Sequence, residues 1–103
     1  MNPFGNPQKL MKQLQQQQEQ MQREIAALSI ESTSGGGMVR VVMDGEKKIQ
    51  SLTIDPEVVS QDDVEMLQDL VLTAVNEAAH KVDEAIQEKL GGMMGGLKLP
   101  GLT

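Results

Sequence analysis

The hydrophobic period changes twice along the chain, and this change constrains the fold more than any other feature. Over residues 11–28 apolar positions recur at alternating steps of three and four. Over residues 28–54 they alternate or gather in short β-branched runs, and over residues 64–86 they recur near every 3.6 positions. The pattern predicts an α+β fold, with an N-terminal long helix, a three-stranded antiparallel sheet and a C-terminal long helix.

The first helix is predicted over residues 7–28, with Pro7 in its first turn and a length of about 33 Å. Its heptad positions are occupied by Met11, Leu14, Gln18, Met21, Ile25 and Leu28. A heptad register favours pairing with another helix, and a single polar residue such as Gln18 is compatible with such a pair.

Three strands are predicted, over residues 28–33, 38–43 and 48–54, separated by the glycine-rich segment 34–37 and by Asp44-Gly45. Asp-Gly predicts a type I′ hairpin turn, which requires positive φ at both central residues. Ile49 and Leu52 lie three positions apart rather than two, so we expect a bulge or a change of face between them.

The second helix is predicted over residues 61–90, about 45 Å long. Ser60 followed by Asp63 resembles an N-cap with an acidic residue in the first turn. Gly91-Gly92 is expected to end the helix.

This arrangement gives one domain over residues 1–90 and a flexible glycine-rich tail over residues 91–103. Three strands span only about 14 Å across, so each helix is two to three times as long as the sheet is wide. Because a single chain of 103 residues offers nothing for the surplus helix to pack on, we expect an intertwined homodimer.

The composition removes several classes of function. The chain has no cysteine, tryptophan or tyrosine and only one phenylalanine, so thiol chemistry and aromatic base-stacking platforms are excluded. His80 is the only histidine and is expected on the polar face of its helix, and Gly35-Gly36-Gly37 lacks the lysine and serine of a phosphate-binding loop. We therefore expect no enzyme activity, metal, cofactor or small-molecule substrate.

No apolar run approaches the roughly 20 residues that span a bilayer, and the first residues lack the features of a secretory signal. We expect a cytoplasmic protein that does not bind membranes.

Four separated motifs in order carry a family resemblance: residues 6–13 (NPQKLMKQ), 34–41 (SGGGMVRV), 52–57 (LTIDPE) and 65–78 (EMLQDLVLTAVNEA). In these segments, and in the GGLKLPG of its ending, the chain resembles the YbaB/EbfC family. The resemblance implies an α-β-β-β-α homodimer whose paired helices project like the arms of tweezers. It also implies mostly non-specific binding of double-stranded DNA by a bacterial nucleoid-associated protein, with effects on nucleoid organisation and gene expression.

The net charge of −6 opposes DNA binding unless the cations are gathered away from the acids. Residues 1–29 carry three cations against two acids, whereas residues 61–103 carry eight acids against three cations. The candidate DNA-binding residues are therefore those of the first helix: Lys9, Lys12, Gln16 and Arg23. We expect weak, salt-sensitive binding with limited sequence preference.

Other interpretations remain open at this stage. The lysines of the first helix also fit an ordinary solvated face. A dimeric adaptor that binds proteins and not DNA is the main functional alternative. A prefoldin-like holdase ranks third, because three strands stand where those chaperones have a hairpin extension.

Overall fold

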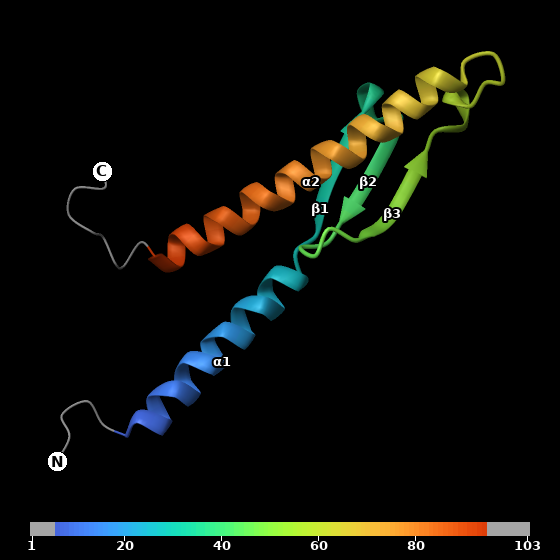
Figure 1. The fold of residues 1–103 in the computed structure, drawn as a ribbon. Coiled ribbons are helices and arrows are strands. Elements are labelled where there is room, and N and C mark those ends of the chain that lie inside the picture. Colours follow the sequence, from blue (N-terminus) through green and yellow to red (C-terminus); the bar gives the residue numbers. More distant parts are fainter. Residues whose placement is uncertain (1–5, 95–103) are drawn as a thin grey trace, which may run out of the picture.

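The computed structural model describes residues 6–94. The elements in chain order are α1 (Pro7–Ala26), β1 (Ile30–Ser34), the 3-10 turn η1 (Gly35–Gly37), β2 (Val39–Met43), β3 (Ile49–Ile54), the 3-10 turn η2 (Pro56–Val58) and α2 (Val64–Met94). The predicted α+β class and the order of its elements are confirmed (Figure 1).

The molecule is elongated, with extents of 77 × 31 × 16 Å. Helix α2 crosses one face of the sheet, and its C-terminal part continues past the strands (Figure 1). Helix α1 leaves the sheet near the β2–β3 hairpin and extends toward the same side as the end of α2 (Figure 1). Neither helix in the described part of the chain is long and apolar enough to cross a membrane.

The sheet is an antiparallel meander in the order β1-β2-β3, and it contains the expected bulge. The register shifts next to Met43, which pairs with Ile49, so that Gln50 falls outside the regular ladder. Because of this extra residue, Ile49, Leu52 and Ile54 all lie on the same face of the sheet as the buried residues of β2. This is the face on which α2 packs.

The core lies between β2 and α2. Its buried residues are Val39, Val41 and Met43 from the strand and Ala74, Ala78 and Val82 from the helix. The two alanines bring the helix close to the sheet because they have no side chain beyond Cβ. From β1, Ser34 donates a hydrogen bond of 2.6 Å from its Oγ to the backbone oxygen of Leu70, which ties the sheet to α2.

The β2–β3 turn differs from the prediction. Positive φ occurs at Lys47 (65°) and not at Gly45, so the connection is not a type I′ turn. The carbonyl of Asp44 accepts the N–H of Lys47, while its carboxylate accepts those of Glu46 and Lys48 at 2.9 and 3.0 Å. An aspartate at the first position favours a type I turn, and the left-handed residue that follows closes the hairpin.

The helix ends also differ from the prediction in part. Helix α1 begins at Pro7 as expected, and the Asn6 side chain accepts the N–H of Gln8 as its N-cap; it ends at Ala26, two residues early. For α2, Asp63 rather than Ser60 is the cap, because its Oδ1 accepts the N–H of Met66 at 3.1 Å.

Gly91 and Gly92 do not end α2, which continues to Met94. Glycine inside a helix costs about 1 kcal/mol relative to alanine, but it ends a helix only where the chain turns into the left-handed region. The predicted tail beyond this point, residues 95–103, lies outside the described residues.

Candidate nucleic-acid interface

Helix α1 carries the four candidate residues on one side. At about 100° per residue, Lys9, Lys12, Gln16 and Arg23 fall within an arc of roughly 60°. All four side chains are exposed. We call this set the basic stripe; from Lys9 to Arg23 it extends about 21 Å along the helix.

The opposite side of α1 is apolar. Leu10, Met11 and Leu14 are 50%, 70% and 57% exposed, while Met21 and Ile25, nearer the sheet, are half-buried. We call Leu10, Met11 and Leu14 the apolar stripe. Its mean direction lies about 180° from that of the basic stripe, so a partner packed on one leaves the other accessible.

Most cations outside α1 are paired with carboxylates. The ion pairs are Arg40–Glu31 at 3.5 Å, Lys47–Asp83 at 2.7 Å, Lys48–Glu46 at 3.5 Å and Lys89–Glu24 at 4.0 Å. Lys81 donates from Nζ to the backbone oxygen of Glu31 at 3.3 Å.

The cations of the basic stripe differ from these. Among the described residues, Lys9, Lys12 and Arg23 have no carboxylate within 4.0 Å; Arg23 only donates to the backbone oxygen of Glu19 at 3.4 Å. The unpaired positive charge of the described chain is therefore concentrated on α1.

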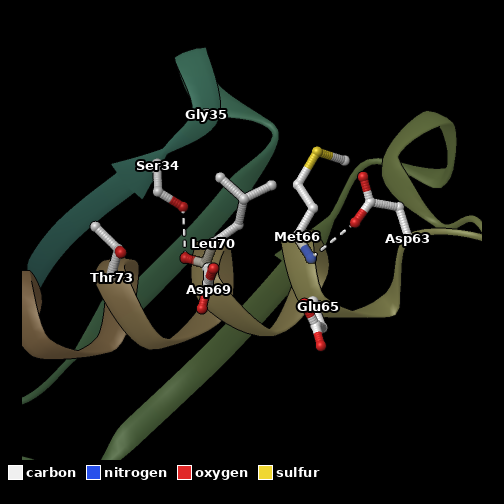
Figure 2. Close-up of a pocket in the computed structure, with 8 residues that line it drawn as sticks. All are labelled: Ser34, Gly35, Asp63, Glu65, Met66, Asp69, Leu70 and Thr73. Atoms are coloured by element: carbon white, nitrogen blue, oxygen red, sulfur yellow. Dashed lines mark hydrogen bonds between the residues drawn. The ribbon is translucent and has the colours of Figure 1, made fainter.

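A pocket at the N-terminal end of α2 is acidic. Figure 2 shows Asp63 on the loop just before the helix and Glu65 and Asp69 on its first turns, with Ser34 and Thr73 at the other end of the pocket. A helix N-terminus normally favours anions, but here Asp63 already accepts the N–H of Met66, and Glu65 and Asp69 also line the pocket. Three carboxylates in its lining make this pocket an unfavourable place for a phosphate.

A second concavity, between β3 and α2, is apolar. It has a volume of about 450 Å³ and is lined by Ile54, Leu67, Gln68, Val71, Leu72 and Val75. Helix α2 packs on β1 and β2 and leaves most of β3 uncovered, so that Ile49 and Leu52 of the same face are about half exposed. We call the groove together with these two residues the β3/α2 surface.

The remaining candidate for chemistry is His80. Its Nε2 lies 2.8 Å from Oε1 of Glu84 on the exposed side of α2, which is the polar face that the sequence predicts. In the part of the chain that the structure describes, no group of three or more histidine, cysteine, aspartate or glutamate side chains is arranged to hold a metal ion.

The sequence brings out the basic stripe but misses the β3/α2 surface. The stripe follows from spacing within one helix, which periodicity captures directly. The surface depends on the sideways position of α2 over the sheet, and no local pattern reports that position. The only signal in the sequence is the surplus of helix length over the width of the sheet, which indicates a second copy but not its position.

Fold and charge together define a small α-β-β-β-α protein. Its first helix carries cations without carboxylate partners among the described residues, and the rest of the chain is acidic. A profile of the YbaB/EbfC DNA-binding family matches residues 2–97. The chain belongs to this family.

Relatives support the same assignment. A nucleoid-associated protein of Koribacter versatilis is 52% identical over 96 residues, covering 93% of this chain and 95% of its own. One from Pelotomaculum thermopropionicum is 48% identical over 101 residues, covering 95% and 96%. The crystal structure of an uncharacterized protein from Helicobacter pylori is similar with a TM-score of 0.65 and 26% identity, covering 82% of this chain and 98% of that one.

Proposed function

We propose that the protein is a homodimer that binds double-stranded DNA through the basic stripes of its two α1 helices, largely without sequence preference. The observation that carries the proposal is the location of the unpaired cations: Lys9, Lys12 and Arg23 share one exposed side of α1. Cations that are already paired have less to gain from a phosphate, so these three side chains are the strongest candidates.

The kind of contact supports non-specific binding. Lysine, arginine and glutamine donors bind phosphate oxygens without reading bases, and such contacts set position rather than sequence. The glutamines that flank the stripe, Gln13 and Gln20, extend the same type of donor. A salt-sensitive complex on many DNA sequences is the expected behaviour, and it fits a protein working at the bacterial nucleoid.

The second copy is the proposed occupant of the β3/α2 surface. Its groove has no charged residue in its lining, whereas the chain as a whole carries −6, so two copies approach there with the least repulsion. The β3 strand is also an open sheet edge next to half-exposed apolar side chains, which isolated proteins normally protect. A two-fold arrangement would supply two arms to one duplex.

The test compares two triple variants with equal loss of charge. Lys9→Gln, Lys12→Gln and Arg23→Gln remove the stripe cations, which have no carboxylate partner in the described part of the chain. Arg40→Gln, Lys48→Gln and Lys81→Gln remove two cations paired with carboxylates and one that binds the backbone oxygen of Glu31 on another element. Fluorescence anisotropy on a labelled duplex at several salt concentrations gives the slope of log K against log[salt]. With six cations per dimer, we expect a slope of up to about −5 in the wild type.

The first triple variant should bind at least tenfold more weakly at low salt, with a slope near zero. The control should stay close to the wild type. Equal losses in both variants would show that only net charge matters, and unchanged binding by the first variant would contradict the proposal.

The adaptor alternative has one observation in its favour, the exposed apolar stripe of Leu10, Met11 and Leu14. If α1 binds a protein partner, that partner stays bound to this protein after complete nuclease digestion. The DNA proposal predicts that nuclease abolishes the association.

A further inference from the structure

The base of α1 is held by very few contacts. The helix does not pack along any strand or along α2, and its connections to the body are near its C-terminal end. There Glu24 lies 4.0 Å from Lys89, and half-buried Ile25 meets the β2–β3 hairpin at Gly45. The direction of a 20-residue helix therefore depends on one or two contacts.

Gly45 is buried, and its contact with Ile25 is between main chains. A methyl group on Gly45 would overlap the carbonyl oxygen of Ile25 and lie 2.6 Å from its carbonyl carbon. The Ile25 side chain is a further obstacle, since its Cγ2 would be 2.9 Å away. No side-chain rotation removes an overlap with a backbone carbonyl.

Both sides of this contact are held in place. The hairpin is closed by the two hydrogen bonds that the Asp44 carboxylate accepts, and Lys47 ties it to Asp83 on α2 at 2.7 Å. On the other side, the carbonyl of Ile25 also accepts the N–H of Leu28 at 3.1 Å, in the last turn of α1. A larger residue at position 45 must therefore displace the whole helix relative to the sheet.

We propose that Gly45 is the positioning residue that sets the direction of α1, and thereby aligns the basic stripe for DNA. The inference rests on the proposed function for its consequence, but its structural part stands separately. A helix of this length is about 30 Å long, so a tilt of 10° at the base moves its far end by about 5 Å. That displacement is enough to take lysines out of reach of the phosphates they would bind.

The experiment measures the direction of α1 and DNA affinity in the same variants. The protein has no cysteine, so Gln15→Cys and Asn76→Cys, both at exposed positions, introduce one label site on each helix. Spin-labelled chains are exchanged with an excess of unlabelled chain, so that double electron–electron resonance reports the distance within one chain. Gly45→Ala is compared with Gly91→Ala, whose new methyl group meets nothing within 4 Å.

We expect Gly45→Ala to shift the distance by several ångströms and to weaken DNA binding roughly tenfold, because the two arms no longer engage one duplex together. Adding Ile25→Ala should not restore either value, because the main obstacle is the carbonyl. Gly91→Ala should match the wild type in both. An unchanged distance in Gly45→Ala, or a shifted distance with normal DNA affinity, would overturn the proposal.

A measurement on the wild type keeps the proposal testable if Gly45→Ala does not fold. If the contact at Gly45 fixes the direction of α1, the distance between the two labels has a narrow distribution in the wild type without DNA. A broad distribution would overturn the proposal. Failure of the proposed function is recognised separately: it would appear as normal binding by the Lys9, Lys12 and Arg23 variant, whatever the distance in Gly45→Ala.

Discussion

At the scale of single residues, short polar side chains determine where the two helices begin. Asn6 caps α1, and Asp63 caps α2 through the N–H of Met66. Ser60 and Asp63 each offer a side-chain oxygen shortly before an apolar helical pattern, so spacing alone does not separate them. In the structure the side-chain hydroxyl of Ser60 accepts the N–H of Asp62 at 3.2 Å, within the turn that precedes the helix, and no N–H of the helix itself.

Asp63→Ala should destabilise the folded protein by about 1 kcal/mol, because it leaves a first-turn N–H of α2 without its partner. Ser60→Ala is the matched control and should cost no more than a few tenths, as expected for an exposed turn residue. Urea unfolding followed by circular dichroism, at one fixed chain concentration, measures both. A larger loss in Ser60→Ala than in Asp63→Ala would move the cap back to Ser60.

Gly45 illustrates what sequence reasoning reaches and what it misses at this scale. Asp44-Gly45 correctly marks the hairpin, because the local preference for a turn is strong. The reason for glycine is different from the predicted one: it lacks positive φ and instead lies against the carbonyl of Ile25. That contact joins two segments twenty residues apart, and no local pattern contains it.

At the scale of elements, periodicity predicts most of the structure. The helical period predicts α1 and the opposite sides on which its basic and apolar residues lie, because both are properties of a single helix. The three-residue step between Ile49 and Leu52 gives the bulge in β3, because the two side chains need an extra residue to reach one face. The extension of α2 through Gly91 and Gly92 escapes prediction, since glycine weakens a helix without always ending it.

Glu19 lies next to the basic stripe on α1, one turn before Arg23, and has no cation within 4.0 Å among the described residues. Glu19→Gln should therefore strengthen DNA binding about twofold per arm, or roughly fourfold for the dimer, at low salt. Glu57→Gln removes an equal charge from an exposed site on η2 and should change affinity less. Anisotropy titrations on one duplex measure both, and equal gains would mean that the position of the charge is irrelevant.

At the scale of the whole molecule, charge and apolar surface are separated. The basic stripe lies on α1, α2 carries six acids against two lysines, and the β3/α2 surface has an uncharged groove. The sequence predicts a second copy from surplus helix length, but it does not predict the β3/α2 surface, which is the proposed contact. That surface depends on α2 packing over β1 and β2 rather than over β3.

Leu72→Glu tests this surface. Leu72 is 60% exposed in the single chain, so a glutamate there is tolerated by the fold but places charge inside the proposed dimer contact. Val59→Glu is the matched control, at 61% exposure and outside the groove. Light scattering at micromolar concentration should give one chain for Leu72→Glu and two for Val59→Glu. DNA affinity of the Leu72 variant should fall at least about tenfold, because one arm is lost.

If Leu72→Glu and Val59→Glu were both dimeric, or both monomeric, the result would contradict a dimer contact confined to the β3/α2 surface. Normal DNA affinity in a monomeric Leu72→Glu protein would show that one arm is sufficient.

Sedimentation velocity of the protein with a fluorescent duplex, at low and at raised salt, tests the central claim most directly. We predict that the duplex at low salt sediments as a complex with two protein chains, and that it is released as the salt concentration rises. A duplex that sediments alone at low salt, or that carries a single chain, would contradict the account.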